Sequence, residues 1–298
     1  MKIHILGICG TFMGGLAQIL VEKGHQVSGA DQQFYPPMSD QLQRLGVEMI
    51  QGYDPTNLPA ADLFVIGNAL SRGNPSVEYI LSYKLPFTSG PQMLGELIEG
   101  RQVIAVAGTH GKTSTSFMLC EIFQHQSVDI GYLVGGVSQS IKSSAQLGSA
   151  DIFVIEADEY DSAFFDKRSK FVHYHPDTLI VNNIEFDHAD IFSNLLDILK
   201  QFHHVIRTIP ADGNILIRPE GDNMSALMDM GYWSHVHKIG TIETIAIDMK
   251  KNIFSFGDEI FNLNALPFNG MHNYQNAIMA MYAAFLHGVA PRDSFKAL

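Results

Sequence analysis

Gly108-Thr109-His110-Gly111-Lys112-Thr113-Ser114 is the stretch from which the fold of this 298-residue chain is read most directly. An apolar run, residues 103–107, leads into it, and a run compatible with a helix, residues 113–125, leads out. A strand, a tight glycine turn and a helix form the context of a phosphate-binding loop, where backbone N–H groups and the helix dipole hold phosphate oxygens. Lys112 would reach the β- and γ-phosphates, and the Thr113 hydroxyl would bind Mg²⁺.

The glycine spacing differs from the common form of this loop. Gly-x4-Gly-Lys-Ser/Thr would need a glycine where Val106 stands, and the chain has the shorter Gly-x-x-Gly-Lys-Thr. A glycine turn with a solvated lysine is the alternative. The strand before the loop and the helix after it favour phosphate binding.

Composition limits the classes of protein to which the chain can belong. With 298 residues, two domains are expected, and 46% hydrophobic against 17% charged residues leave little room for disorder. The formal charge of −12 and the lack of a basic run disfavour a nucleic-acid partner. Two cysteines imply no disulfide framework, and no apolar run is long enough to span a membrane. We therefore expect a cytoplasmic protein with no membrane partner.

The N-terminal residues predict the first unit of a Rossmann-like sheet. Residues 2–8 form an apolar strand, a glycine turn and a helix to about residue 22 follow, and a second strand, 26–30, ends in Asp31. The fingerprint Gly-x-Gly-x-x-Gly is absent because position 9 is Cys9, which disfavours NAD. The glycine turn would then hold a diphosphate at the N-terminus of the first helix, with Asp31 near a ribose or base. The alternative is a purely structural turn.

Strands and helices continue to alternate up to about residue 99, which predicts a parallel sheet covered on both faces. Ligands of such sheets lie beyond the carboxyl ends of the strands. The loops that carry Gly10, Asp31, Ser71–Asn74 and Ser89 are therefore expected at one crevice. Arg72 could meet a phosphate there, and a solvated surface arginine is an equally good interpretation.

Two buried-strand runs in the second region, residues 151–155 and 178–181, each end in acidic residues. Carboxylates at the strand ends of a sheet with a phosphate loop are where Mg²⁺ ligands belong. We favour Glu156, the first residue out of its strand, and His188, beside Asp187. Taken singly, the other acidic residues more often cap helices or face solvent; they are Asp158, Glu159, Asp161 and Asp190.

Three further stretches carry weaker signals. Asn273 and Asn276 share one face of a helix that opens after Gly270, and their amides could read an adenine edge. His173 and His175 lie near residues 167–170, which form a solvated loop or hold substrate carboxylates; the sequence leaves both open. Residues 213–266 read as short strands and turns without chemistry.

Taken together, these stretches resemble the Mur ligase family, the ATP-dependent amide-forming ligases of peptidoglycan metabolism. The stretches that carry the resemblance cover nearly the whole chain: Gly108–Ser114, Glu156 with Asp158-Glu159, Asn183-Ile184-Glu185 with Asp187-His188, and His272-Asn273 with Asn276-Ala277. The resemblance implies an α/β fold with a Rossmann-like domain that binds UDP-N-acetylmuramate, residues 1–99, and a P-loop ATPase-type central domain, residues 100–298.

The activity implied by the resemblance runs through an acyl phosphate. The muramyl carboxylate attacks the γ-phosphate of ATP and gives ADP, and an acceptor amine then displaces phosphate. Residues 7–15, 158–161 and 164–170 look like the branch whose acceptor is the tripeptide L-Ala-γ-D-Glu-meso-diaminopimelate, in peptidoglycan recycling. The branch that adds L-alanine is the alternative. Outside the family, a nicotinamide dehydrogenase and a non-catalytic nucleotide-binding module are the competing readings.

The resemblance also assigns roles to residues. The catalytic residues are Lys112, Glu156 and His188, and the Mg²⁺ ligands are Thr113, Glu156 and His188. The residues for ATP, the co-substrate, are Gly108, Thr109, His110, Gly111, Lys112, Thr113, Ser114, His272, Asn273 and Asn276. The residues for the UDP-sugar are Gly10, Thr11, Phe12, Met13, Gly14, Asp31, Ser71 and Arg72.

Two features depart from the family pattern. Several Mur ligases carry a carbamylated lysine where this chain has His203, so the resemblance does not carry a carbamate over to this chain. Family members also have a third domain that contributes to the acceptor site, and the chain stops at Leu298, before such a domain. The chain is therefore expected to be a truncated ligase that binds both nucleotides and does not ligate alone.

Overall fold

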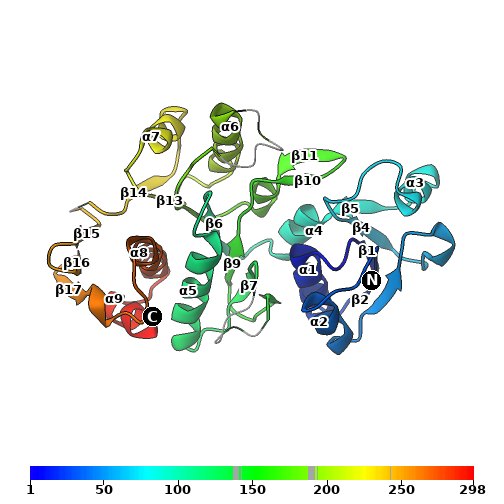
Figure 1. The fold of residues 1–298 in the computed structure, drawn as a ribbon, viewed down its shortest axis with the longest axis horizontal. Helices are drawn as coiled ribbons and strands as arrows, with labels where there is room; N and C mark the ends of the chain where they lie inside the picture. Colours follow the sequence, from blue (N-terminus) through cyan, green and yellow to red (C-terminus); the bar gives the residue numbers. More distant parts are fainter. Residues whose placement is uncertain (137–140, 142, 187–191, 193, 242) are drawn as a thin grey trace.

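The computed structural model describes residues 1–136, 141, 143–186, 192, 194–241 and 243–298. Two sheets, one parallel and one parallel except at its edge, lie side by side with helices on both faces of each (Figure 1). This is the mixed α/β architecture expected from the alternating strands and helices. Within the described residues, no helix is both long and apolar enough to span a bilayer.

The N-terminal sheet has five parallel strands in the order β3-β2-β1-β4-β5. The strands are β1 (Lys2–Leu6), β2 (Gln26–Asp31), β3 (Glu48–Gln51), β4 (Leu63–Ile66) and β5 (Phe87–Ser89). Helices α1 (Thr11–Glu22), α2 (Met38–Arg44) and α4 (Gly90–Leu97) send side chains into one apolar cluster, and α3 (Pro75–Ser82) packs into a separate one. The strand order reverses between β1 and β4, where a sheet of this kind opens a crevice for ligands.

The central sheet has seven strands in the order β14-β13-β12-β6-β9-β7-β8. They are β6 (Gln102–Ala107), β7 (Gly131–Leu133), β8 (Ala145–Gln146), β9 (Ile152–Glu156), β12 (Thr178–Val181), β13 (Asn214–Ile217) and β14 (His235–Lys238). All neighbours pair in parallel except β7 and β8. The order places β6, which leads into the phosphate loop, between the two strands that end in acidic residues.

Strand β6 is apolar on both sides and therefore takes part in two cores. Val103, Ala105 and Ala107 face a cluster that includes helices α6 (Leu195–Ile206) and α7 (Asp222–Asp229). Ile104 and Val106 face a second cluster, built on α5 (Lys112–His125) and α8 (Met271–Leu286). Burial on both faces is what a continuous apolar run in a parallel strand predicts.

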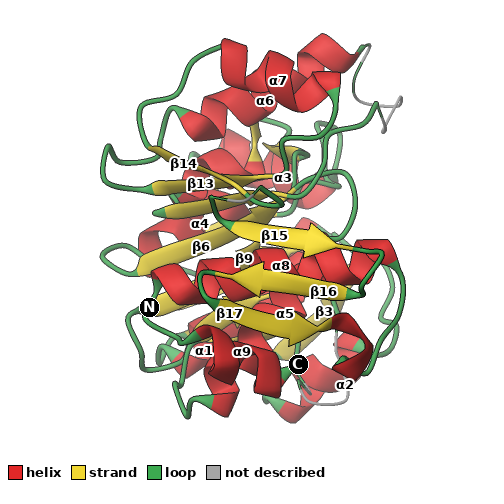
Figure 2. Cartoon of the chain, turned by 90° about the vertical axis from the view of Figure 1, so that its left-hand side faces the viewer, coloured by secondary structure: helices red, strands yellow, loops and turns green. Residues whose placement is uncertain are grey.

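A small antiparallel sheet covers α8 on its outer side (Figure 2). Its strands are β15 (Ile245–Asp248), β16 (Ile253–Phe256) and β17 (Glu259–Asn262), and the helix α9 (Pro291–Ala297) follows α8. The sequence predicted only short strands and turns for residues 213–266. This was wrong at α7, a short helix that buries Met224 and Leu227.

The two sheets are joined by direct packing. Helix α1 lies against β7 and β8 of the central sheet, and a Cβ placed on Gly15 would be 3.2 Å from the Ala145 Cβ. Helix α4 lies against the 3-10 segment η2 (Lys170–Tyr174), where a Cβ on Gly95 would come far too close to the His173 carbonyl oxygen. The crevice of the N-terminal sheet therefore faces the phosphate loop of the central sheet.

Candidate active site

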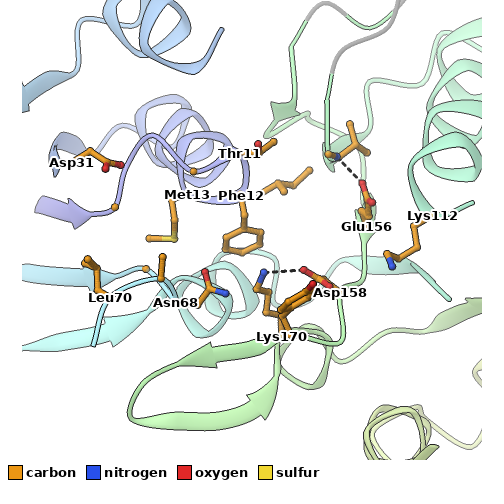
Figure 3. Close-up of a pocket in the computed structure, with 18 of the residues that line it drawn as sticks. Thr11, Phe12, Met13, Asp31, Asn68, Leu70, Lys112, Glu156, Asp158 and Lys170 are labelled. Carbon is orange, nitrogen blue, oxygen red and sulfur yellow. Dashed lines mark hydrogen bonds and ion pairs between the residues drawn. The ribbon is translucent and has the colours of Figure 1, made fainter. Parts of the chain in front are cut away.

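A cavity of about 580 Å³ lies between the two sheets and is open to residues of both (Figure 3). The N-terminal sheet contributes the glycine turn after β1, the start of α1, and the loop after β4. The central sheet contributes the phosphate loop, the segment after β7 and the segment after β9. The lining residues are Gly7, Gly10, Thr11, Phe12, Met13, Asp31, Tyr35, Tyr53, Gly67, Asn68, Ala69, Leu70, Thr109, Lys112, Leu133, Val134, Gly135, Glu156, Asp158, Tyr160, Lys170 and Tyr174.

The phosphate loop has the backbone that its glycines allow. Gly108 has φ +132° and Gly111, the residue before α5, has φ +81°, a region that side chains rarely adopt. A Cβ on Gly111 would lie 2.6 Å from Oδ1 of Asn276, so α8 closes directly over the loop. Oδ1 of Asn183 accepts a 2.8 Å hydrogen bond from the His110 N–H. These contacts fix the loop before any phosphate arrives.

Lys112 lies at the start of α5 with its side chain 14% exposed. Its Nζ donates to the Gly108 carbonyl oxygen at 2.6 Å and lies 3.4 Å from Oε2 of Glu159. The ammonium is thus folded back over its own loop, at the place where the loop would hold a phosphate.

Glu156 and Thr113, two of the three residues predicted to bind Mg²⁺, are in direct contact. The Thr113 hydroxyl donates to Oε1 of Glu156 at 2.8 Å, and the Gly135 N–H donates to Oε2 at 2.7 Å. A hydroxyl and a carboxylate beside a phosphate loop fit Mg²⁺, which takes its other ligands from phosphate and water. Among the described residues, no three His, Cys, Asp or Glu side chains cluster as a metal site, so the protein would supply only part of the ligand set.

His188, predicted as a catalytic and metal-binding residue, lies outside the described residues, as do Asp187 and Asp190. The described part of the same segment supports the loop from the other side. Oγ1 of Thr109 accepts a 2.9 Å hydrogen bond from the Glu185 N–H, and Nε2 of His110 lies 3.9 Å from Oε2 of Glu185.

The first glycine turn opens the N-terminus of α1 into the cavity. Gly10 precedes the helix without a side-chain cap, and Thr11, Phe12 and Met13 line the cavity. Unpaired backbone N–H groups at a helix N-terminus favour an anion. Asp31 also lines the cavity, where Oδ2 accepts from the Cys9 N–H at 2.8 Å and Oδ1 from the Tyr53 hydroxyl at 3.4 Å. Burial, then the Asp31 charge, raises the pKa of Tyr53.

Three residues predicted for the UDP-sugar lie away from the cavity lining. A Cβ on Gly14 would meet the Met38 side chain, so this glycine lets α1 and α2 pack closely. Ser71 is exposed and follows the part of its loop, residues 68–70, that does line the cavity. The exposed Arg72 pairs with Glu78, with Nε 2.8 Å from Oε1. The loop after β4 lines the cavity through Asn68, Ala69 and Leu70, and the predicted residues 71–74 and Ser89 are not among the lining residues.

The residues predicted to bind ATP outside the loop differ in their contacts, and one of them packs against the loop. Asn276 is 9% exposed and packs against Gly111. Nδ2 of Asn273 donates to the Asn269 carbonyl oxygen at 2.9 Å, and His272 is exposed, as is Ser114 at the end of the loop stretch. His203 lies on α6, where Nε2 is 3.1 Å from the Gly231 carbonyl oxygen, and it is not among the residues lining the cavity.

The structure adds residues that sequence reasoning did not assign to the site. Lys170 and Tyr174 lie on η2 and line the cavity, with Asp158 and Tyr160 beside them. The Lys170 Nζ is 2.9 Å from Oδ2 of Asp158. The sequence offered two signals here: residues 158–161 and 164–170 carried part of the resemblance, and the run at residues 167–170 read equally as a solvated loop or as a site for substrate carboxylates.

Comparison with known proteins agrees with this geometry. The profile described as "Mur ligase family, catalytic domain" matches residues 2–102, and the "Mur ligase middle domain" profile matches residues 106–284. The chain belongs to the Mur ligase family.

Individual relatives make the resemblance more specific. The chain is 50% identical over 307 residues to the Escherichia coli UDP-N-acetylmuramate–L-alanyl-γ-D-glutamyl-meso-2,6-diaminoheptandioate ligase, and the match covers all of this chain and 67% of the relative. It is 31% identical to a UDP-N-acetylmuramate–L-alanine ligase of Psychrobacter, with 97% of this chain and 61% of that protein covered. The crystal structure of the Neisseria meningitides UDP-N-acetylmuramate:L-alanyl-γ-D-glutamyl-meso-diaminopimelate ligase superposes with a TM-score of 0.92 at 42% identity, covering 100% of this chain and 97% of that chain.

Proposed function

We propose that the chain is the nucleotide-binding part of an ATP-dependent, ADP-forming ligase that joins UDP-N-acetylmuramate to the tripeptide L-Ala-γ-D-Glu-meso-diaminopimelate. The observation that carries this proposal is the single cavity that the first glycine turn and the phosphate loop share. A UDP-sugar held by the first and an ATP held by the second would meet inside it. Residues 1–99 would bind the UDP-sugar and residues 100–298 the ATP.

The chemistry requires a carboxylate to approach the γ-phosphate of ATP. Two unit charges about 4 Å apart repel by about 4 kcal/mol at an effective dielectric near 20. Lys112 would turn from the Gly108 carbonyl to the phosphates and offset part of this charge. Thr113 and Glu156 would hold Mg²⁺, which supplies positive charge at the phosphate oxygens when bound. The N-terminus of α1 would hold the diphosphate of the UDP-sugar.

The acceptor is assigned from relatives rather than from the cavity. Identity of 50% to the tripeptide-adding enzyme against 31% to the L-alanine-adding enzyme supports the tripeptide, and L-alanine is the second candidate. The match covers 67% of the Escherichia coli enzyme, so we expect these 298 residues alone to bind nucleotides without forming the amide. ATP as co-substrate supports a cytoplasmic location.

Calorimetry on this chain tests the proposal. We would titrate UDP-N-acetylmuramate, Mg-ATP and NADH separately, with UMP as the control for the nucleoside part. Saturable binding of the first two, and none of NADH, is the expected result. If NADH bound and the muramyl nucleotide did not, the N-terminal sheet would be a dinucleotide site and the ligase proposal would fail.

A further inference from the structure

Among the described residues that line the cavity, Lys170 is the one cation besides Lys112. It begins η2, its side chain is 11% exposed, and its Nζ is 2.9 Å from Oδ2 of Asp158. Two aromatic rings flank the ammonium: Phe12 with its centroid at 5.7 Å and Tyr160 at 5.6 Å. Phe12 comes from α1 of the N-terminal sheet, so the ammonium lies at the seam between the two sheets.

This arrangement leaves donors for a ligand. An ammonium has three N–H donors, and Asp158 accepts from one of them. A ring face attracts a cation without replacing a full hydrogen bond. Among the described residues, no other hydrogen-bond acceptor is assigned to the Lys170 Nζ. A partly desolvated lysine that borders a cavity, and that has donors without an acceptor among the described residues, is suited to an anionic group.

A second polar group lies on the same wall. Tyr174, on the last turn of η2, lines the cavity and is 2% exposed, and its hydroxyl has no hydrogen-bond partner among the described residues. Burial, and then the Asp158 charge, raises the pKa of Tyr174 well above its usual range, so the hydroxyl keeps its proton. Buried polar groups normally find partners. Among the described residues, η2 therefore has a hydroxyl without a partner at its last residue, in addition to the Lys170 ammonium at its first.

The position of Lys170 selects between the two anionic parts of a UDP-sugar acid. In Figure 3, Asp31 lies at one end of the cavity and Lys112 at the other, with Lys170 and Asp158 between them. The start of α1 already offers backbone N–H groups to a diphosphate. Asp158 follows Glu156 by two residues at the end of β9, so Lys170 is tied to the wall where the γ-phosphate would be transferred. The carboxylate has to reach this wall to react.

We propose that the Lys170 ammonium, held by Asp158 and flanked by Phe12 and Tyr160, binds the carboxylate of the sugar acid and so selects UDP-sugars that carry an acid. The inference rests on the proposed function, because it takes the cavity to be the UDP-sugar site. It adds the group that distinguishes N-acetylmuramate from a neutral N-acetylhexosamine.

The test compares two ligands on three chains by calorimetry. UDP-N-acetylmuramate carries the carboxylate on a lactyl ether, and UDP-N-acetylglucosamine has a free hydroxyl in place of that ether. Lys170→Met keeps an unbranched side chain, one atom shorter, and removes the charge. Lys167→Met is the matched control, since Lys167 lies three residues before Lys170, its Nζ is 2.8 Å from Oδ2 of Asp161, and its side chain is 71% exposed outside the cavity.

Lys170→Met should raise the Kd for UDP-N-acetylmuramate by about 10-fold to 100-fold and leave the Kd for UDP-N-acetylglucosamine within about threefold, because a charge-assisted hydrogen bond is lost only with the acid. Lys167→Met should bind both like the wild type. An equal loss for both ligands would assign Lys170 to the diphosphate and overturn the proposal, as would no loss for either.

Two further outcomes have distinct meanings. If the wild-type chain bound neither UDP-sugar, the proposed function would fall, whatever the variants did. If Lys170→Met did not fold, Lys170→Arg would replace it. That variant keeps the positive charge and should retain the preference for the acid, and loss of the preference in a folded arginine variant would contradict the carboxylate assignment.

Discussion

Glu156 illustrates, at the residue scale, how two neighbouring groups orient a carboxylate. The Thr113 hydroxyl and the Gly135 N–H each donate to one of its oxygens, and a Cβ on Gly135 would lie 2.7 Å from Oε2. The carboxylate is therefore held in one orientation beside the phosphate loop. Hydrogen bonds that orient a carboxylate in this way strengthen the binding of a metal ion by that carboxylate.

Glu156→Gln should weaken binding of Mg-ATP by roughly 10-fold to 100-fold, because the neutral amide is a poor Mg²⁺ ligand and its NH₂ group conflicts with the donors around it. Calorimetry with Mg²⁺ and with EDTA measures the effect, which should vanish without the metal. Glu185→Gln is the matched control, since that carboxylate is 65% exposed and its contact to Thr109 is made by the backbone. Equal weakening in EDTA would exclude a metal role for Glu156.

His4 makes stability depend on pH through its position on β1. It is fully buried, its Nδ1 is 2.8 Å from the Ser28 hydroxyl, and burial lowers its pKa to about 4. Between that value and the unfolded value of about 6.5, the unfolded chain binds a proton that the folded chain does not. The folded state therefore loses stability as the pH falls through this range.

Between pH 7 and pH 5 the free energy of unfolding should fall by about 2 kcal/mol more in the wild type than in His4→Gln. The figure follows from a change of about 1.4 kcal/mol per pH unit below pH 6.5. Urea unfolding of both proteins at both pH values measures this difference. The contributions of the other histidines are the same in both proteins and cancel. His272→Gln, at an exposed position, should follow the wild type. A His4→Gln variant that lost as much stability as the wild type would show that His4 takes up its proton without unfolding.

At the scale of elements, helix α4 meets η2 through a glycine. An added Cβ on Gly95 would meet the His173 carbonyl oxygen, which is backbone and moves only with its segment. The same addition at Gly14, on α1, would meet the side chain of Met38, which can change rotamer. Both glycines lie in helices, so the gain in helix propensity from alanine is similar, about 1 kcal/mol.

Gly95→Ala should therefore destabilise the chain by about 1 to 3 kcal/mol, as overpacking against a fixed neighbour does, and Gly14→Ala by less. It should also weaken UDP-sugar binding, because η2 carries Lys170 and Tyr174. Thermal unfolding and calorimetry on the two variants measure both effects. If Gly14→Ala were the more damaging variant, the seam between α4 and η2 would not be the tighter contact.

Several helices and strands could be predicted from the sequence, and others could not. Strand β12 was predicted with the bounds that the structure has, because an apolar run between polar residues is distinctive, and the glycine turns after β1 and β6 were recognised from their context. Helix α7 was missed because its sequence is mostly polar and only two of its side chains are buried. Its helical state comes from packing, which a local pattern does not contain.

The candidate site likewise contains residues that were predicted from the sequence and residues that were not. Gly10, Asp31, Lys112 and Glu156 were predicted near strand ends, and parallel sheets bring strand ends to one edge. Lys170 lies on η2, between strands, and only the packing of η2 against α4 carries it to the cavity. Arg72 is at a strand end as well, but Glu78 on the next helix holds its guanidinium. Competition between partners of this kind is invisible in the sequence.

On the scale of the whole molecule, the two sheets share one apolar cluster. It includes Met13 and Leu16 of α1 together with Leu133 and Phe171 of the central part. Polar bonds cross the seam beside it, where Oε2 of Glu22 accepts from the Leu147 N–H at 2.6 Å. A shared core makes separate unfolding of either sheet costly, because each would expose the apolar surface of the other.

We therefore expect one unfolding transition, and we expect a ligand of the cavity to protect both sheets. UDP-N-acetylmuramate at 100 times its Kd should add about 2.7 kcal/mol to the free energy of unfolding. Hydrogen exchange followed by mass spectrometry should then slow in β1 and also in β13, a strand without a residue in the cavity lining. Slower exchange confined to residues 2–99 would mean that the sheets unfold separately, and that the cavity forms between two independently stable units.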